Sequence, residues 1–123
     1  MKNTSIVCYS NIELHKFLIL KNNRNKSGIY RWTHKTTGKS YIGSAVNLAN
    51  RLNYYFSPKS LNNSLLVKRS YIYSSILEYG YSEFILEILE YCDIEVLLLR
   101  EQYYLDTLNP EYNIRKKVGI RNK

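Results

Sequence analysis

One glutamate stands where the pattern of apolar residues predicts a side chain that faces inward. Between Asp93 and Pro110, apolar residues recur at helical spacing, at Ile94, Leu97, Leu98, Tyr104 or Leu105, and Leu108. Glu101 falls in the middle of this stripe. A carboxylate that faces a core or a cleft is costly unless it is paired or binds a cation. The alternatives to a cation ligand are an ion pair with a neighbouring element, or an escape to solvent at the edge of the stripe.

Two tyrosines, Tyr30 and Tyr41, stand in neighbouring segments that favour β-strands. Residues 27–33 and 39–45 flank a turn-like segment, which predicts a hairpin with a four-residue loop. The register that follows, with Thr33 facing the end of the loop, places Tyr30 opposite Tyr41 on one face of the sheet. By themselves, two neighbouring phenols indicate no more than a packed aromatic pair.

An arginine and a third tyrosine share one face of the next expected element. Asn47 is a suitable N-cap for a helix from Leu48 to about Phe56. Arg51 and Tyr55 lie at positions i and i+4 of this helix, so their side chains are neighbours. A guanidinium is permanently charged and grips a phosphate in a fork that lysine cannot reproduce.

The remaining pattern completes an order of elements. Pro58 is expected to end the first helix, with a polar loop through residues 62–64. A second helix is expected from about Arg69 to Tyr79, and alternation from Phe84 to Ile88 predicts a third strand. The helix that contains Glu101 then runs from a cap at Asp93 to about Leu108.

The first and last residues do not fit this core pattern. Residues 1–26 are interpreted as a leader and linker of unknown role, with a short amphipathic helix at 11–21 that uses Phe17. Residues 116–123 are interpreted as a basic tail.

The charge is unevenly distributed and indicates a polyanionic partner. The net charge is +8 overall, made of +11 in residues 1–70, −8 in residues 71–111 and +5 in residues 112–123. Basic blocks bind phosphates by releasing counterions, although many basic surfaces only aid solubility. No apolar run approaches the ~20 residues that cross a bilayer. Cys8 and Cys92 are far apart in the chain, which argues against a structural zinc site and favours an intracellular setting.

Several of these residues together resemble the motif set of the GIY-YIG endonuclease family. The hairpin contains Gly28-Ile29-Tyr30 and, after ten residues, Tyr41-Ile42-Gly43. Arg51 follows Gly43 by eight residues, Tyr55 follows four later, and Glu101 stands in Arg100-Glu101-Gln102-Tyr103. Asn113 in Tyr112-Asn113-Ile114 matches the asparagine that closes the set. The resemblance covers about residues 27–115.

The resemblance implies both a fold and an activity. The fold is α/β (α+β), a three-stranded sheet flanked by three helices in the order β-β-α-α-β-α, which is also the order of the expected elements. The activity is hydrolysis of phosphodiester bonds in DNA. Tyr30, Tyr41, Arg51, Tyr55 and Glu101 are the expected catalytic residues, and Gly28, Gly43 and Asn113 the expected structural ones. Glu101 is the expected ligand of one divalent cation, Mg²⁺ first and Mn²⁺ as a substitute.

A narrower similarity concerns homing endonucleases of fungal mitochondrial group I introns. It rests on stretches such as Ser70-Tyr71-Ile72-Tyr73 and Leu108-Asn109-Pro110-Glu111-Tyr112-Asn113. It implies an intron-encoded, mitochondrial protein. Such enzymes usually carry a DNA-binding region after the catalytic domain, and this chain ends at Lys123. The alternative interpretation is therefore a non-catalytic nucleic-acid-binding remnant of a truncated intron-encoded protein.

Overall fold

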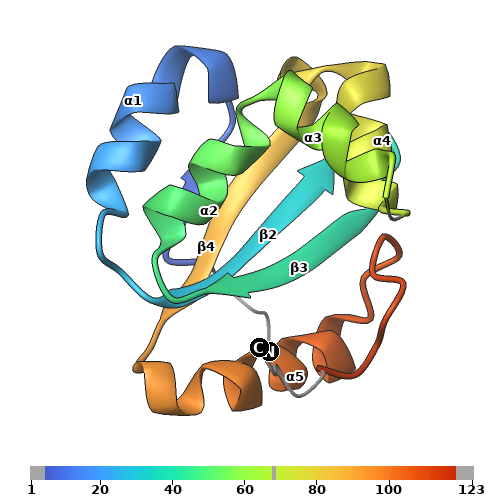
Figure 1. Cartoon of the computed structure of the whole chain (residues 1–123). Helices are drawn as coiled ribbons and strands as arrows, with labels where there is room; N and C mark the ends of the chain where they lie inside the picture. Colours follow the sequence, from blue (N-terminus) through green and yellow to red (C-terminus); the bar gives the residue numbers. More distant parts are fainter. Residues whose placement is uncertain (1–4, 68, 119–123) are drawn as a thin grey trace.

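The computed structural model describes residues 5–67 and 69–118, which form a sheet between two layers of helices (Figure 1). The elements in chain order are β1 (Val7–Tyr9), α1 (Ile12–Asn22), β2 (Gly28–His34), β3 (Ser40–Ala45), α2 (Leu48–Tyr55), α3 (Pro58–Leu65), α4 (Tyr71–Tyr79), β4 (Phe84–Tyr91) and α5 (Leu97–Leu108). Two short 3₁₀ turns, η1 (Tyr81–Glu83) and η2 (Ile94–Val96), precede β4 and α5.

The sheet is antiparallel and has four strands in the order β1-β4-β2-β3. The α/β class is confirmed, but the expected count of three strands and three helices is too low for the described residues. The elements beyond that count are β1, α3 and α1, and α1 agrees with the helix expected at residues 11–21. The expected leader therefore contributes a strand to the sheet and a helix that packs against α2 and β4.

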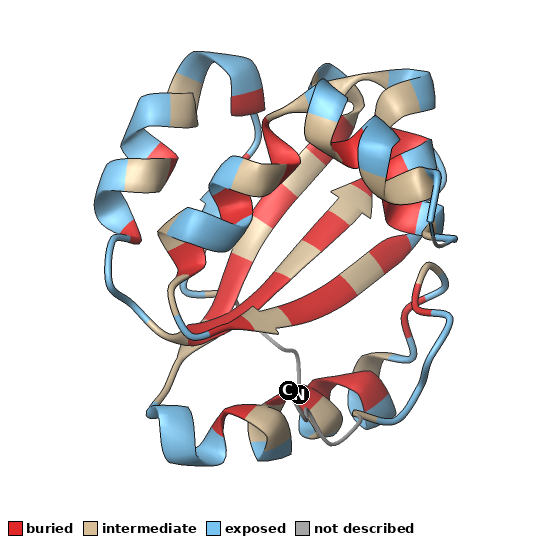
Figure 2. Cartoon of the chain, viewed as in Figure 1, coloured by how far each residue is buried: buried red, intermediate tan, exposed pale blue. Residues whose placement is uncertain are grey.

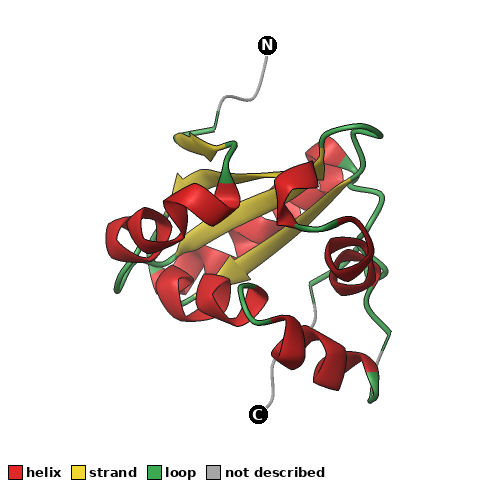
Figure 3. Ribbon diagram, turned by 90° about the horizontal axis from the view of Figure 1, so that it is seen from above, coloured by secondary structure: helices red, strands yellow, loops and turns green. Residues whose placement is uncertain are grey.

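Strand alternation gives the sheet two apolar faces, and helices cover both (Figures 1 and 3). On one face, Tyr30, Trp32 and Leu86 belong to a large cluster with residues of α1, α2, α3 and α4. On the other face, Ile29 and Ile42 pack with Leu97, Tyr104 and Leu105 of the single helix α5. Buried residues accordingly line the strands and the helix faces turned to the sheet (Figure 2).

The hairpin register differs from the expected one by two residues. Thr33 pairs with Ser40, so Tyr30 lies opposite Gly43 and Trp32 lies opposite Tyr41. The expectation that Tyr30 faces Tyr41 is therefore wrong. A shift of two residues keeps every side chain on its face, because the period of a strand is two. Tyr30 and Tyr41 remain neighbours on one face, with ring centroids 6.5 Å apart.

The helices begin at polar caps, and one of them replaces an expected loop. The Asn47 side chain accepts a hydrogen bond from the Asn50 backbone N–H at the start of α2, as expected. Residues 62–64 belong to α3, whose start is marked by the Ser57 cap and by proline in the first turn. The expected loop is therefore wrong. The expected cap at Asp93 is wrong: Asp93 precedes η2 and makes no side-chain cap there, and Val96 precedes α5.

The helix α1 of the N-terminal segment packs differently from the expectation. The buried side of α1 is formed by Ile12 and Ile19, whereas Phe17 is exposed, contrary to the expected apolar stripe. Within the described residues, every helix is too short or too polar to cross a bilayer. Most of the expected basic tail, residues 119–123, lies outside the described residues.

Candidate active site

A cleft of about 610 Å³ opens at the free edge of β3 and is lined from both faces of the sheet. Tyr30 and Tyr41 reach it from the face covered by α2. Glu101 and Leu105 reach it from α5, which covers the opposite face. Because β3 is the last strand of the sheet, side chains from the two faces can meet around its edge.

The lack of a side chain at Gly43 lets Tyr30 approach β3 closely at the cleft. A Cβ atom at Gly43 would overlap the hydroxyl oxygen and the Cζ atom of Tyr30. Tyr30 therefore lies flat across Gly43, and the glycine is required by this close approach. Gly28 is required for a different reason: a Cβ there would overlap the backbone oxygen of Glu90 on the neighbouring strand. Gly28 thus allows the strands to pack closely, and Gly43 shapes the cleft.

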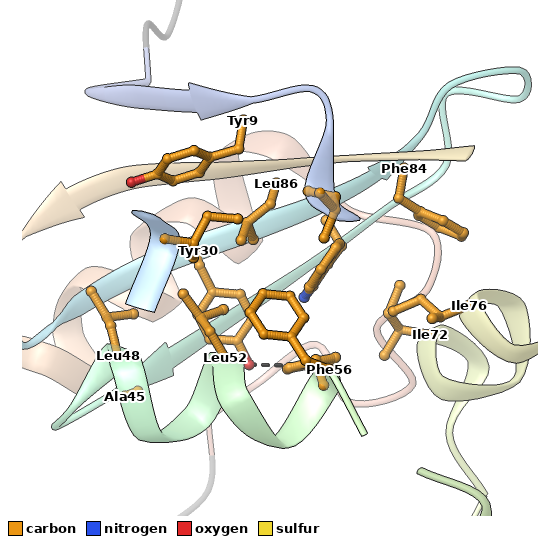
Figure 4. Close-up of a cluster of buried hydrophobic side chains, with 14 of the residues drawn as sticks. Tyr9, Tyr30, Ala45, Leu48, Leu52, Phe56, Ile72, Ile76, Phe84 and Leu86 are labelled. Atoms are coloured by element: carbon orange, nitrogen blue, oxygen red, sulfur yellow. Dashed lines mark hydrogen bonds between the residues drawn. The ribbon is translucent and has the colours of Figure 1, made fainter. Parts of the chain in front are cut away.

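Tyr30 and Tyr55 join their hydroxyls by a hydrogen bond of 3.0 Å, drawn as a dashed line from Tyr30 in Figure 4. Both rings are buried, and they contact edge to face at 5.8 Å. Burial, together with Tyr41, raises the pKa of Tyr30 well above its usual 10.0, although Arg51 and the Tyr55 hydrogen bond act in the other direction. Tyr30 is therefore a neutral phenol at neutral pH, and Arg51 alone does not turn it into a base.

Arg51 lies at the cleft one helical turn before Tyr55 and is surrounded by phenols. Burial lowers the pKa of its guanidinium, but Tyr30, Tyr55, Tyr73 and Tyr41 together raise it, so Arg51 keeps its charge. Tyr73 of α4 packs edge to face against Tyr55, with the ring centroids 5.5 Å apart. Burial raises the pKa of Tyr73, and the charge and hydrogen bonding of Arg51 oppose this effect. Tyr73 therefore interacts with the guanidinium from the side of α4.

Glu101 is buried, with 8% of its surface exposed, and its carboxylate faces the hairpin. The Ser44 hydroxyl donates a hydrogen bond of 2.6 Å to Oε1 of Glu101. Ser44 follows Gly43 on β3 and points to the face that α5 covers. Glu101 thus lies beside the cleft and does not escape to solvent at the edge of the apolar stripe.

Asn113 attaches the segment after α5 to the free edge of β3. Its side chain accepts from the Ile42 N–H and donates to the Ile42 carbonyl, each at 2.9 Å. The neighbouring Tyr112 N–H donates to the Ser40 carbonyl at 2.8 Å. A side chain that pairs with both groups of one residue mimics a strand, so part of the exposed edge is covered.

The cleft offers one carboxylate to a divalent cation. Glu101 is the only acid among the described residues that line it, and these parts of the chain hold no group of three or more His, Cys, Asp or Glu suited to a metal. A single carboxylate fits Mg²⁺, which keeps several waters and is commonly completed by substrate phosphates. The same residues would not make a zinc site, which needs three or four protein ligands.

All but one of the expected site residues are brought together here. Tyr30, Tyr41, Gly43, Arg51, Tyr55, Glu101 and Asn113 all line the cleft, whereas Gly28 lies away from it. Sequence reasoning did not identify Ser44 or Tyr73. Ser44 directly follows the Tyr-Ile-Gly motif, so its position on the same strand face as Ile42 could have indicated it. Tyr73 carries no such signal, because it is one of 13 tyrosines and its role depends on how α4 packs.

Comparison with known proteins identifies this arrangement. Residues 26–113 match the model of the GIY-YIG catalytic domain. The chain belongs to the GIY-YIG endonuclease family. Its fold resembles the catalytic domain of the intron endonuclease I-TevI, in a glutamate-to-alanine variant (27% identity, TM-score 0.61), and covers 76% of this chain and 97% of that domain. A second structure of the I-TevI catalytic domain gives 28% identity and a TM-score of 0.58, over 73% of this chain and 99% of that one.

Two further matches are UvrC proteins. The N-terminal endonuclease domain of UvrC from Thermotoga maritima, a tyrosine-to-phenylalanine mutant bound to its catalytic divalent cation, shares the fold. It has a TM-score of 0.52 and 23% identity, and the match covers 84% of this chain and 97% of that domain. The UvrABC system protein C of Neisseria meningitidis is 30% identical over 99 residues, which is 79% of this chain. The chain spans only 14% of the length of that relative.

Proposed function

We propose that this chain is a DNA endonuclease that hydrolyses phosphodiester bonds with one divalent cation, Mg²⁺ first and Mn²⁺ as a substitute. One observation carries the proposal: a buried carboxylate, a guanidinium and three tyrosines, which come from opposite faces of the sheet, share one cleft. These groups meet the main needs of phosphodiester hydrolysis, which are charge stabilisation, an oriented water and help for the leaving oxygen.

Glu101 is the proposed ligand of the cation. Its carboxylate is fixed by Ser44, and such outer partners orient a ligand and tune its affinity. When bound, the cation would stabilise the charge on the departing oxygen. The UvrC domain of Thermotoga maritima, described as bound to its catalytic divalent cation, supports a cation in a fold of this kind.

Arg51 is the proposed phosphate-binding group. It stays charged among the phenols of Tyr30, Tyr55 and Tyr73. A guanidinium in this position can donate two hydrogen bonds to the non-bridging oxygens of the scissile phosphate. Since the negative charge on these oxygens changes during hydrolysis, a fixed donor stabilises the transition state more than a mobile one does.

Tyr30 is proposed to orient the attacking water as a neutral phenol. With its pKa raised by burial, it acts first as a hydrogen-bonding group and not as a preformed base. Tyr55 bonds to the Tyr30 hydroxyl and so limits where its proton and its lone pair can point. Tyr41 lines the same cleft and completes the group of phenols. Proton transfer through Tyr30 therefore needs further positive charge, which the cation would supply.

We further propose that the chain is the catalytic domain of an intron-encoded homing endonuclease that acts in a mitochondrion. Two features support this proposal. The I-TevI catalytic domain structures match with TM-scores of 0.61 and 0.58 and identities of 27% and 28%, above the 0.52 and 23% of the UvrC domain. The abundance of Tyr, Asn, Lys, Ile and Leu suits an AT-rich organellar genome.

Incubation of the purified chain with supercoiled plasmid tests the proposal. We expect nicked or linear DNA with Mg²⁺ and intact plasmid with EDTA. Binding without cutting, at any Mg²⁺ or Mn²⁺ concentration, would instead support the non-catalytic remnant. Cutting that survives EDTA would contradict the proposed role of the cation.

A further inference from the structure

The segment that follows Asn113 forms one wall of the cleft and carries positive charge into it. Arg115 and Lys117 line the cleft, and Ile114 and Val118 line it with them. Arg51 and Arg69 add two further cations, so four basic residues and one acid, Glu101, line the same space within residues 5–67 and 69–118. This positive charge is more than one scissile phosphate needs for its binding.

Two amide side chains fix this segment at its ends. Asn113 holds one end by its two hydrogen bonds to Ile42 of β3. Gln102 of α5 holds the other end in the same manner. Its Nε2 donates to the Lys116 carbonyl at 3.0 Å, and its Oε1 accepts from the Val118 N–H at 2.8 Å. The segment is therefore a clamped loop and not a free tail, and Gln102 is the residue directly after Glu101.

Further contacts stiffen the clamped loop, which we define as residues 114–118. The Lys116 ammonium donates to the Pro110 carbonyl, which ties the loop to the segment that directly follows α5. Val118 packs against the apolar cluster between the sheet and α5. Lys116 is thus occupied inside the loop, while Arg115 and Lys117 are exposed to the cleft.

The ion pairs among the described residues do not involve these cations. Among the described residues, ion pairs join Arg31 to Glu87 and Arg100 to Glu90, each at 2.8 Å, and both lie outside the cleft. None of the four cleft cations takes part in them. Positive charge concentrated in a cleft raises the local concentration of a polyanion and binds it by releasing counterions.

We propose that the clamped loop is a binding site for the DNA backbone, in which Arg115 and Lys117 contact phosphates that flank the scissile bond of double-stranded DNA. Arg69, from the loop before α4, binds the same strand within the cleft. The contacts are to phosphates and so position the duplex without reading its sequence. This inference rests on the proposed endonuclease function and adds the path of the substrate to it.

The salt dependence of DNA binding tests the inference, because each lost phosphate contact lowers the slope of log K against log salt by about 0.9. Binding of a short duplex is measured in EDTA, so that no cutting occurs. The variant Arg115→Ala/Lys117→Ala is compared with Arg24→Ala/Lys35→Ala, which removes the same charges from exposed sites outside the cleft. We expect the first variant to lose about two units of slope and at least tenfold in affinity, and the control to keep the wild-type slope.

A third variant, Gln102→Ala, tests whether the position of the clamped loop matters for DNA binding in addition to its charge. It removes one end of the clamp without changing the net charge, so we expect weaker binding at low salt with normal thermal stability. Equal slopes for the cleft variant and its control, in a wild-type chain that cuts plasmid, would overturn the inference and leave the endonuclease function intact. A wild-type chain that binds the duplex with the expected slopes but never cuts would overturn the endonuclease function alone.

Discussion

The Ser44 hydroxyl donates a 2.6 Å hydrogen bond to the Glu101 carboxylate, and this bond joins the hairpin to the last helix. The two residues are 57 positions apart and belong to β3 and α5. Ser44 alternates with Gly43, so one residue of β3 orients the carboxylate while its neighbour makes room for Tyr30. A single stretch of strand thereby aligns the two sides of the cleft.

Removal of the Ser44 hydroxyl should lower the affinity of the site for the cation. In Ser44→Ala the Glu101 carboxylate loses a fixed donor, and outer partners of metal ligands are typically worth 10–100-fold in metal affinity. We expect the Mg²⁺ concentration for half-maximal cleavage to rise about tenfold, with the rate recovered at high Mg²⁺. Ser74→Ala, at an exposed position of α4, is the control. An unchanged Mg²⁺ requirement would show that Ser44 does not orient the carboxylate.

Removal of the Tyr30 hydroxyl should affect the reaction far more than the fold. Tyr30→Phe keeps the ring contact with Tyr55 and loses one hydrogen bond, which costs about 1 kcal/mol of unfolding free energy. Cleavage should fall by about 10²–10⁴-fold if Tyr30 orients or transfers a proton. Because the pKa of Tyr30 is raised, its ionisation should add no inflexion to the rate profile near neutral pH. Near-normal cleavage by Tyr30→Phe would remove Tyr30 from the mechanism.

A methyl group on Gly43 should displace Tyr30. Gly43→Ala places a Cβ where the Tyr30 hydroxyl now lies, and overpacking of this kind typically costs about 1–3 kcal/mol. Cleavage should be lost together with this stability. In a Tyr30→Ala background the same Gly43→Ala change should cost little, because the overlapping ring is gone. Urea unfolding of the four proteins gives the coupling energy, and purely additive costs would argue against the close approach.

Much of this architecture could be predicted from local signals. The hairpin, the Asn47 cap and the inward position of Glu101 all follow from patterns within one element. The register was wrong by two residues, yet the faces were right, since only odd shifts exchange them. The helix α3 could also have been predicted, because Ser57 followed by Pro58 is a normal helix start.

Other features depend on contacts that no local pattern contains. β1 has three residues and is a strand because it pairs with β4, about 80 positions later. Tyr30 and Glu101 line one cleft from opposite faces of the sheet only because β3 is the last strand, which is a property of the whole sheet. The contribution of Tyr73 depends likewise on the packing of α4 against α2.

Loss of the Asn113 side chain should release the segment that covers β3. Asn113→Ala removes two buried hydrogen bonds and leaves the Ile42 backbone groups without these partners, so we expect a loss of about 2 kcal/mol. The clamped loop would lose one of its two attachments, and DNA binding should weaken with it. Urea unfolding measures the first effect, with Asn62→Ala at an exposed position of α3 as the control. Equal stability of the two variants would contradict the structural role of Asn113.

The most direct measurement concerns Glu101, whose carboxylate defines the proposed cation site. Glu101→Gln keeps the size and the hydrogen-bonding capacity of the side chain but removes its charge. With Mg²⁺ and supercoiled plasmid, we predict that this variant cuts at least 10²-fold more slowly than the wild type, since a neutral amide is a poor ligand for Mg²⁺. It should still bind a short duplex in EDTA about as tightly as the wild type. Wild-type cutting by Glu101→Gln, with an unchanged Mg²⁺ requirement, would contradict the account.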